Sequence, residues 1–378
     1  MPKLEDGSEK GLKGHFKEDF SHRTRVGLAP RAGHIDRDAP YKRIATEEAW
    51  TFPELVKAQV DYLESGDMPH DDSLKMAGMF ANMPSLQDML QDLGELRISH
   101  MDQLGIDRQL LLLTAPGVQV VRPGEGTPLS IMANNIAAEA CAKYPDRFSA
   151  CAAFDPRDVA GSVKELERAA KLGLNGAVLN SHFQGRYLDE LEFWPILEAL
   201  EANDLALYIH PTAPFNAPHY EKRGFFGALG GFPHDVWIHM MGLIMSGAFD
   251  RFPKLRLVIG HMGECMPLHL YRFDWMQGNA DGRPRPQMFP VEQTPKLQHP
   301  ASYYFKHNIW ITTSGVGWEP AIKFCQDVLG PERVIYAMDY PYQQSSDEVA
   351  AYDRMDMSAE HKKMLMEDNA RHVFRITG

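Results

Sequence analysis

The stretch Leu205-Ala-Leu-Tyr-Ile-His-Pro211 is a short apolar run followed by the polar residue His210. A second run of the same kind is Gln109-Leu-Leu-Leu-Leu-Thr114. Unbroken apolar runs are typical of strands buried on both faces, as in parallel sheets, whereas half-exposed strands alternate. The two stretches therefore predict strands of a parallel sheet.

Further runs of this kind recur along the chain, separated by longer helix-like stretches. The eight predicted strands are Arg43–Glu48, Gln109–Thr114, Phe148–Phe154, Ala177–Ser181, Ala206–Pro211, Leu255–His261, Ile309–Ser314 and Val334–Asp339. Predicted helices between them include Leu129–Lys143, Val159–Leu172, Leu191–Ala202 and Glu319–Leu329. Eight β/α units predict an α/β fold, a (β/α)8 TIM-type barrel. An open doubly wound sheet is the alternative, but no glycine-rich phosphate loop follows the first strand.

The bulk composition limits the classes of function. The chain has 378 residues, 44% hydrophobic and 24% charged, which suits one large barrel domain. Its net charge of −12 argues against nucleic-acid binding, which needs a basic face. No apolar run reaches the ~18 residues that span a membrane, and the N-terminus shows no apolar core of a signal peptide. We expect a cytoplasmic protein with no membrane or nucleic-acid partner.

The four cysteines, Cys141, Cys151, Cys265 and Cys325, form no C-x-x-C pair. A thiolate zinc site is therefore not expected. We predict buried thiols in a reducing compartment.

The domain organisation is one barrel with an N-terminal arm and loop insertions. Residues 1–40 show no apolar period and are predicted to be an extended arm, either disordered or packed on a neighbouring subunit. Residues 41–378 form the barrel. Long connections at 50–93, 212–235 and 276–306 are expected to be lids or subunit contacts, and a homodimer or higher homo-oligomer is expected. The methionines of 50–93 either line an adaptable pocket or pack ordinarily.

Polar residues at the ends of the predicted strands mark the expected site, because barrel enzymes build their sites at the C-terminal ends of their strands. The residues concerned are Glu47, Glu48, His210, His261 and Asp339, with His182 and Arg186 after the fourth strand. Alone, a histidine here is more often a hydrogen-bonded core residue, and an aspartate can cap a turn. Together these imidazoles and carboxylates predict a divalent-metal site of Mn, Zn or Fe type.

Several segments that carry these residues resemble the amidohydrolase superfamily, in the branch of aminocarboxymuconate semialdehyde decarboxylase and the aromatic acid decarboxylases, the 5-carboxyvanillate decarboxylases among them. The resemblance runs from about residue 42 to the end. The segments are Arg43-Ile-Ala-Thr-Glu-Glu-Ala49, Ser181-His-Phe-Gln-Gly-Arg-Tyr-Leu-Asp189, Tyr208-Ile-His-Pro211, Gly260-His-Met-Gly-Glu264, Leu270-Tyr-Arg272, Trp318-Glu-Pro-Ala-Ile-Lys-Phe-Cys325 and Tyr336-Ala-Met-Asp-Tyr-Pro-Tyr342.

The resemblance implies a role for each matching residue. Glu47, His210 and Asp339 would bind the metal, manganese or alternatively zinc. Asp339 would also deliver a proton to the substrate, and His261 would be a second catalytic residue. Residues that would contact the substrate are His182, Arg186 and Arg272. Glu48 would point to the other face of its strand, although alternation alone does not decide between it and its neighbour.

The activity that the resemblance implies is metal-dependent, non-oxidative decarboxylation of an ortho-hydroxy aromatic acid. A hydrolase or hydratase of a ring-cleavage product or lactone is the alternative, and a non-catalytic barrel is a more distant one. Many superfamily members have a His-x-His pair on the first strand, where this chain has Glu47 and Ala49. With one metal ligand fewer than those members, this chain is better suited to decarboxylation than to a hydrolysis that needs a zinc-activated hydroxide. Asn82 stands where the 5-carboxyvanillate decarboxylases are expected to have a substrate-binding arginine, so the substrate is open.

Overall fold

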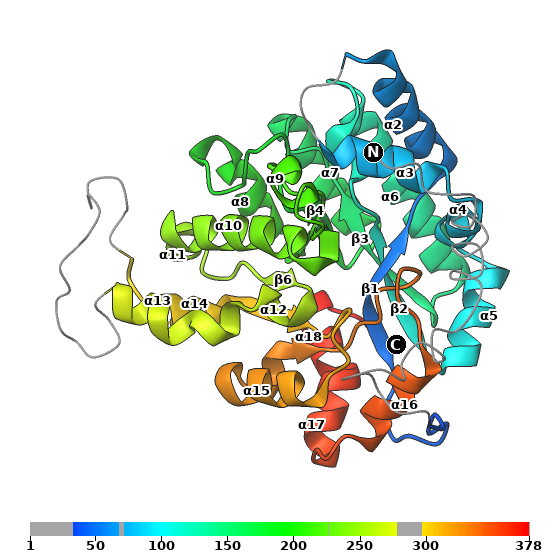
Figure 1. The fold of residues 1–378 in the computed structure, drawn as a ribbon, viewed down its shortest axis with the longest axis vertical. Helices are drawn as coiled ribbons and strands as arrows, with labels where there is room; N and C mark the ends of the chain where they lie inside the picture. The colour runs from blue at the N-terminus through cyan, green and yellow to red at the C-terminus, as the bar shows by residue number, and fades with distance from the viewer. Residues whose placement is uncertain (1–32, 68–71, 226, 278–296, 378) are drawn as a thin grey trace.

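Eight parallel strands follow one another around a single sheet in the order β1 to β8, with helices on the outside (Figure 1). The computed structural model describes residues 33–67, 72–225, 227–277 and 297–377. The strands are β1 (Ile44–Trp50), β2 (Arg108–Leu113), β3 (Phe148–Ala153), β4 (Gly176–Asn180), β5 (Ala206–His210), β6 (Leu257–Ile259), β7 (Ile309–Thr312) and β8 (Val334–Ile335). Every strand residue is buried except His210, which is partly exposed. The predicted (β/α)8 barrel is confirmed.

The barrel is closed between β8 and β1 by hydrogen bonds outside a regular ladder. The backbone N–H of Ala49 donates to the carbonyl of Tyr340 at 2.7 Å. The buried carboxylate of Glu48 accepts the backbone N–H groups of Met338 and Tyr340 at 3.1 and 3.3 Å. Because a side chain takes these N–H groups, β8 is shorter than the predicted strand Val334–Asp339.

Helices follow the strands and cover the barrel, and the main hydrophobic core fills the space between the two layers. Among the described residues the helices are α2 (Pro53–Ser65), α3 (Asp72–Ala81), α4 (Pro84–Gln91), α5 (Glu95–Leu104), α6 (Gly126–Lys143), α7 (Val159–Lys171), α8 (Trp194–Ala202), α9 (Ala217–Glu221), α10 (Gly231–Met245), α11 (Ala248–Arg251), α12 (His261–Glu264), α13 (Leu270–Met276), α14 (Ala301–Asn308), α15 (Glu319–Leu329), α16 (Ser346–Arg354), α17 (Ala359–Lys363) and α18 (Asn369–Phe374). The helices predicted from sequence correspond to α6, α7, α8 and α15.

The connection after β1, predicted only as a long insertion over 50–93, folds into α2, α3 and α4. Pro53 begins α2, and Gly66 ends it with a left-handed φ of 73°. Proline at the first turn and glycine after the last are common helix boundaries. Of the methionines in this segment, Met76 is buried in α3, Met79 is 54% exposed, and Met68 lies outside the described residues.

Residues 33–40, the described part of the predicted arm, lie against the barrel of the same chain. The backbone N–H of Asp36 donates to Asp353 at 2.8 Å, and the Arg37 guanidinium donates to the carbonyls of Asp102 and Gln103. The rest of the predicted arm lies outside the described residues, so the boundary at residue 40 stays a prediction.

Within the described chain no helix combines the length and the apolar character needed to cross a bilayer.

The cysteine prediction was wrong for one of the four residues. Cys151 and Cys325 are buried and Cys141 is half-buried, but Cys265 is exposed. Cys265 follows the tight turn after β6, where the chain turns from the barrel end towards the surface. No thiol is paired with another.

Candidate metal centre and active site

Three of the predicted site residues, Glu47, His210 and Asp339, converge at the C-terminal end of the barrel. One ligand atom from each lies within 4.8 Å of the other two. Glu47 comes from β1, His210 ends β5, and Asp339 follows β8. The closed sheet brings together strand ends that are far apart in sequence, so the barrel itself creates the cluster.

Glu47 is held by two neighbours and leaves one oxygen free. Its Oε2 accepts a hydrogen bond from the Tyr208 hydroxyl and another from Thr312 Oγ1 at 2.9 Å. Its Oε1 is buried and has no hydrogen-bond donor, although His210 Nε2 is 3.4 Å away and His261 Nε2 is 3.5 Å away. A buried carboxylate oxygen without a donor is costly unless a cation faces it.

His210 is oriented so that one ring nitrogen faces the cluster. Its Nδ1 lies 2.7 Å from the carbonyl of Pro211, which can only accept, so Nδ1 carries the proton. In the neutral ring, Nε2 then has a free lone pair beside Glu47 Oε1. Burial lowers the pKa of His210 below its usual value, which keeps the ring neutral. A neutral imidazole fixed through its other nitrogen is the form that binds metal ions.

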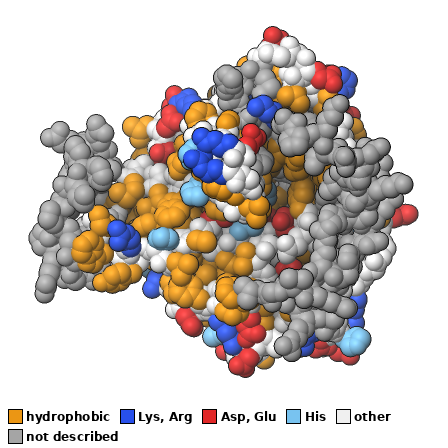
Figure 2. Space-filling view, viewed as in Figure 1, with side chains coloured by type: hydrophobic (Ala, Val, Ile, Leu, Met, Phe, Trp, Pro, Cys, Tyr) orange, Lys and Arg blue, Asp and Glu red, His pale blue; other side chains and the backbone are white. Residues whose placement is uncertain are grey.

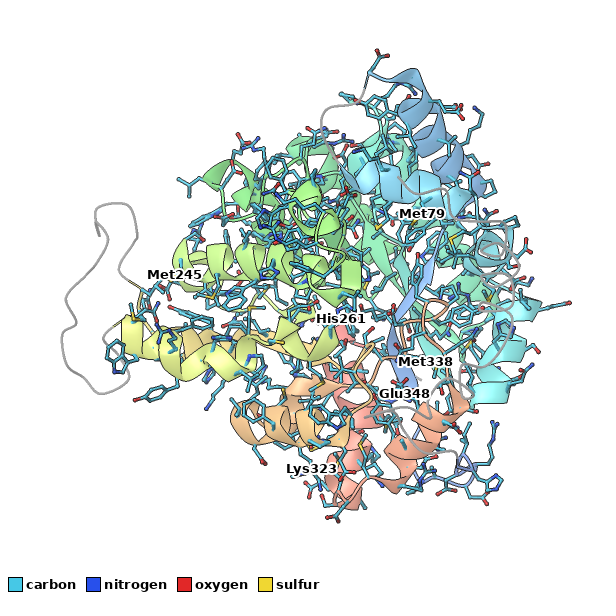
Figure 3. The ribbon with its side chains drawn as sticks, viewed as in Figure 1. Met79, Met245, His261, Lys323, Met338 and Glu348 are labelled. Atoms are coloured by element: carbon cyan, nitrogen blue, oxygen red, sulfur yellow. The ribbon has the colours of Figure 1, made fainter. Side chains whose placement is uncertain are left out.

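The segment after β6 is a left-handed turn that aims His261. Residues 261–265 all have positive φ, from 50° to 71°. Left-handed backbone costs a non-glycine residue roughly 1–2 kcal/mol, so the surrounding contacts must hold it. One such contact is the 2.8 Å hydrogen bond from His261 Nδ1 to Glu264 Oε1. Figure 3 shows His261 near the centre of the molecule in that view.

Gly260, just before this turn, is required by the close approach of Glu47. A Cβ at Gly260 would lie 2.7 Å from Glu47 Oε2 and 2.9 Å from Oε1, too close for any real side chain. Gly263 is also constrained, since its φ is +71° and a Cβ there would lie 2.9 Å from Ile311 Cγ2. The glycines of Gly260-His-Met-Gly263 therefore make room for the carboxylate and for β7.

The charges in the cluster fit a cation. Burial, and then the carboxylate of Glu47, raises the pKa of Asp339 well above its usual value, and His261 opposes this rise. Burial disfavours the charged form of His261, but the carboxylates of Glu264, Glu47 and Asp339 outweigh burial and raise its pKa to about 10. Two buried carboxylates that repel each other, one unpartnered oxygen and one imidazole lone pair make a mixed oxygen and nitrogen site, suited to manganese or zinc.

Asp339 has a left-handed φ of 72°, which is unusual for a residue other than glycine. Its carbonyl accepts the backbone N–H of Gln343 at 2.8 Å. The turn that follows β8 therefore holds Asp339 at the cluster instead of continuing the strand.

Two of the three predicted substrate-binding residues have other partners in this structure, and the third lies on an exposed part of a helix. His182 is buried, and its Nε2 is 2.7 Å from the Ala213 carbonyl. Arg186 forms ion pairs with Glu190 and Glu192. Arg272 is exposed on α13, whose main contacts are with α14 and the turn before α13. The structure thus gathers the predicted ligands and His261 but not these three side chains.

Several residues that build the site were not singled out from the sequence. Tyr208 and Thr312 orient Glu47, as described above. Arg97 is fully buried and donates to the carbonyls of Ala49 and Met89 at 2.7 and 3.1 Å. Its guanidinium also lies 4.6 Å from the centre of the Tyr340 ring. Arg97 therefore connects α5 to the chain just after Glu47 and just after Asp339.

An available sequence signal for Tyr208 was its hydroxyl within an apolar run, two positions before His210 and on the same strand face. Arg97 lies in α5, whose sequence has little amphipathic pattern, and no local signal marks it.

Apolar side chains of α3 lie over the ends of the strands. Met76 packs with Ala115, which follows β2, and with Ala213, which follows β5. The Phe80 ring lies 5.5 Å from that of Tyr342, whose hydroxyl is 2.6 Å from Thr114 Oγ1. Asn82, just beyond α3, donates its Nδ2 to the Gly78 carbonyl at 2.8 Å. The residues around this end thus offer apolar and hydroxyl groups.

Known proteins with a similar sequence and fold include decarboxylases. The amidohydrolase family model matches residues 94–376. Gamma-resorcylate decarboxylase of Rhodococcus jostii (strain RHA1) is 31% identical over 348 residues, covering 88% of this chain and 98% of the relative. The structure of 5-carboxyvanillate decarboxylase from Novosphingobium aromaticivorans DSM 12444, complexed with manganese and 4-hydroxy-3-methoxy-5-nitrobenzoic acid, has a TM-score of 0.84 and 42% identity, covering 90% of this chain and 98% of that one.

A second solved structure is similar at greater distance. The 2,6-dihydroxybenzoate decarboxylase from Rhizobium has a TM-score of 0.75 and 27% identity, with coverage of 89% of this chain and 100% of that one. The family model spans well over half of the chain, and the barrel and the polar strand ends agree with it. This chain therefore belongs to the amidohydrolase family.

Proposed function

We propose that this protein is a metal-dependent carboxy-lyase that removes CO2 from an ortho-hydroxy aromatic acid without oxidation, with manganese as its ion. The convergence of Glu47, His210 and Asp339 around the unpartnered Glu47 Oε1 carries the proposal. Similar solved structures are decarboxylases of hydroxylated aromatic acids, and one has manganese bound, which supports it further. Zinc is the alternative ion, because it accepts the same ligand types.

A divalent ion bound to these three residues would act as a Lewis acid and as a template for the substrate hydroxyl and carboxylate. Asp339 transfers its proton to the ring carbon that bears the carboxylate, and a C–H bond forms. The bond from that carbon to the carboxylate then breaks, CO2 leaves, and the electron pair restores the aromatic ring. His261, 3.5 Å from Glu47 Oε1, holds that proton or a substrate oxygen beside Asp339. No oxidant and no water are consumed.

The substrate class is supported by the side chains around the strand ends. Met76 and Phe80 give an apolar surface suited to a ring, and Tyr342 and Thr114 give hydroxyls. Asn82 is neutral, so it cannot bind a second carboxylate as a guanidinium would. We therefore expect acids with one carboxylate beside a hydroxyl to be better substrates than acids with two carboxylates.

His182 and Arg186 are still proposed to contact the substrate. Their present partners, the Ala213 carbonyl for His182 and Glu190 and Glu192 for Arg186, would have to be exchanged on binding.

We also propose a homodimer that brings Arg272 to the substrate of the neighbouring subunit. Figure 2 shows apolar side chains gathered over the part of the surface formed by α10 and α13. In the turn before α13, Leu268 is 66% exposed, and on α13 itself Tyr271 is 74% exposed, directly before Arg272. A large exposed apolar patch marks an interaction surface, so a dimer built on it would enclose Arg272.

The decisive test is to incubate the manganese-loaded protein with 2,6-dihydroxybenzoate and with 5-carboxyvanillate and to measure CO2. We expect CO2 release that stops with a chelator and returns with manganese. Asp339→Asn should abolish turnover with an unchanged circular dichroism spectrum, whereas the exposed control Asp327→Asn on α15 should behave like the wild type. Absence of CO2 from every ortho-hydroxy aromatic acid, or product with added water, would favour the hydratase or hydrolase alternative.

The trans role of Arg272 has its own test. Asp339→Asn and Arg272→Met should each be inactive alone. Mixed subunits should recover about a quarter of wild-type activity, because half of the dimers are mixed and each has one site with both residues intact. No recovery from a verified mixture of subunits would exclude an Arg272 contribution across the dimer, without affecting the decarboxylase proposal.

A further inference from the structure

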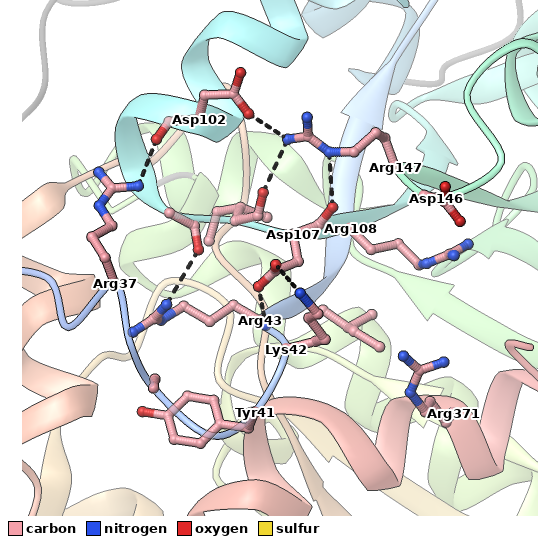
Figure 4. Close-up of a pocket in the computed structure, with 14 residues that line it drawn as sticks. Arg37, Tyr41, Lys42, Arg43, Asp102, Asp107, Arg108, Asp146, Arg147 and Arg371 are labelled. Carbon is pink, nitrogen blue, oxygen red and sulfur yellow. Dashed lines mark hydrogen bonds and ion pairs between the residues drawn. The ribbon is translucent and has the colours of Figure 1, made fainter. Parts of the chain in front are cut away.

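The N-terminal end of the barrel, opposite the proposed active site, contains a cavity of about 670 Å³. Its walls come from the residues just before β1, β2 and β3 and from α18 (Figure 4). That volume is within the range of small-molecule sites, roughly 300–1,000 Å³. Six basic side chains line it: Arg37, Lys42, Arg43, Arg108, Arg147 and Arg371.

The carboxylates near this cavity are fewer than the basic groups. Three line it, Asp102, Asp107 and Asp146, and two more lie behind it, Asp353 bound to Arg43 and Glu367 bound to Arg371. Six positive and five negative charges leave an excess of one positive charge, in a chain whose net charge is −12. The positive charge at this end is therefore local and runs against the charge of the whole molecule.

Most of the basic groups are bound to protein acceptors. Arg37 donates to two backbone carbonyls, and Lys42 forms an exposed ion pair with Asp107 at 3.1 Å. Arg43 is paired with Asp353 at 2.6 Å, and Arg147 with Asp102 at 2.8 Å. These four side chains form the walls of the cavity and are not available to a ligand without rearrangement.

Arg108 differs from them. It is only 6% exposed, and among the described residues its hydrogen bonds go to a carbonyl and a hydroxyl, with no ion pair to a carboxylate. Its Nη1 donates to the Phe148 carbonyl and to Ser149 Oγ, at 3.2 and 3.1 Å. Its Nε and Nη2 have no acceptor in the part of the chain that the structure describes. A guanidinium with two unused donors at the wall of a cavity can bind an anion there without giving up its existing partners.

Arg371 adds a second positive charge to the same space. In Figure 4 the guanidinium groups of Arg108 and Arg371 lie on the same side of the cavity, with the Asp146 side chain on the far side of Arg108. Burial, and then the charge of Arg371, lowers the pKa of Arg108, while Asp146 raises it. The two guanidiniums thus repel each other, and an anion between them would remove the repulsion.

We propose that this cavity is a second binding site, specific for a small oxyanion with at least two negative charges, and that Arg108 is its central anchor. Guanidinium groups bind carboxylate and phosphate oxygens in pairs of parallel hydrogen bonds, which a monovalent ion such as chloride cannot match. The site is at the end of the barrel that contributes stability rather than catalysis. Its ligand is therefore expected to stabilise the fold, independently of the metal-dependent reaction.

The test is isothermal titration of the manganese-loaded protein with inorganic phosphate, at an ionic strength held constant with sodium chloride. Arg108→Gln is compared with Arg251→Gln, an exposed arginine of α11 whose nearest carboxylate oxygen is 3.9 Å away. We expect saturable binding to the wild type and to Arg251→Gln, and a loss of affinity of about tenfold or more in Arg108→Gln. Phosphate binding at the metal would be equal in both variants, so the difference between them isolates this cavity.

A second variant covers the case in which Arg108→Gln does not fold. Arg371 lies on α18, and Arg371→Gln should weaken phosphate binding, as Arg108→Gln should. Equal phosphate affinity in the wild type and in both cavity variants would overturn the proposal. Phosphate binding no stronger than chloride binding would overturn it as well.

Titration with glycerol 2-phosphate and with succinate then distinguishes a phosphate ester from a dicarboxylate as the ligand class. Failure of both compounds while phosphate binds would restrict the site to inorganic oxyanions.

Discussion

The two ends of this barrel both gather charged side chains, but they hold them in opposite ways. At the C-terminal end, His261 and Asp339 have left-handed backbone, and the carboxylates of Glu47 and Asp339 face one another with one Glu47 oxygen unpartnered. At the N-terminal end, no residue other than glycine that lines the cavity has a positive φ, and most arginines are paired or bound to carbonyls. Strain and unbalanced charge thus concentrate where chemistry is proposed, which is where proteins most often retain them.

The comparison also shows what each end needs from its ligand. The C-terminal cluster contains one oxygen without any donor, and a metal ion would satisfy it. The N-terminal cavity contains one guanidinium with two unused donors, and an anion would satisfy it. A change at one end should therefore alter the binding of one ligand and leave the other unaffected.

The largest effect is expected from Glu47→Gln. A neutral amide weakens the attraction for a cation, and we expect metal affinity and CO2 release to fall by more than about 100-fold, since even residues behind metal ligands contribute roughly 10–100-fold. Metal content by mass spectrometry and CO2 release measure the two effects. The exposed control Glu54→Gln on α2 should keep both, and so should Arg108→Gln at the other end. Full metal content in Glu47→Gln would contradict the assignment of Glu47 as a ligand.

A second difference between the two ends is their response to acid. His239 is buried on α10, its Nδ1–H donates to the Ser181 carbonyl, and its Nε2 accepts the N–H of Leu188. Burial lowers the pKa of His239 from 6.5 to about 4, because this bonding needs the neutral ring. The unfolded chain takes up this proton first, so the stability that the neutral ring contributes is complete above pH 6.5. That stability is lost as the pH falls towards 4, by about 3 kcal/mol.

Hydrogen exchange against pH measures this loss. Protection of residues 181–188, at the C-terminal end, should decrease between pH 6.5 and 4. The described lining of the N-terminal cavity contains no histidine, so its residues should change less over that range. His239→Gln should flatten the pH dependence of 181–188, and equal slopes in the variant and the wild type would contradict the role of His239.

A smaller effect is expected from Gly260→Ala. The new Cβ would lie within 3 Å of both Glu47 oxygens, so Glu47 must shift, and we expect metal affinity to fall about 10- to 100-fold. The control is Gly173→Ala, where φ is +84° but no atom lies within 4 Å of the added Cβ. That control should lower the free energy of unfolding by roughly 1–2 kcal/mol from backbone strain and leave metal affinity unchanged. Equal metal affinity in the two variants would mean that Gly260 serves only the backbone.

The smallest effect is expected from Asn82→Arg. A guanidinium beyond α3 should improve kcat/KM for 5-carboxyvanillate by several-fold relative to 2,6-dihydroxybenzoate, since one solvent-accessible charge pair contributes about 1 kcal/mol. The ratio of the two kcat/KM values measures the change in preference. An unchanged ratio would show that residue 82 does not face the substrate, and Asn82→Gln, which stays neutral, should leave the ratio as it is.

Much of the barrel was predictable because each strand satisfies a local requirement. A strand buried on both faces needs an unbroken apolar run, and runs such as Gln109–Thr114 are visible without any knowledge of the fold. The strand ends were less predictable. β6 stops at Ile259 and β8 at Ile335, because a left-handed turn and the carboxylate of Glu48 then take over the backbone. The bonds of Glu48 join distant segments, and the turn after β6 begins where Gly260 closely approaches Glu47.

The helices of 50–93 were missed although local signals were present. Pro53 and Gly66 are the boundary residues of α2, and α3 and α4 each have an amphipathic pattern that was not assigned to a helix. The tertiary structure adds where these helices pack, since Met76 is buried against the residues after β2 and β5.

The sequence by itself determined the number of strands, the barrel class, and the polar strand ends with Glu47, Glu48, His210, His261 and Asp339, because strand burial and polar strand ends are local properties of the chain. The choice of Glu47 over Glu48 came from the family resemblance. Only the tertiary structure decided which oxygen of Glu47 is free, and that Tyr208 and Thr312 take the other. The same holds for the basic cavity, whose residues are scattered from 37 to 371 in the chain. Hydrogen bonds and electrostatic forces depend on distance in space, and the closing of the barrel sets that distance.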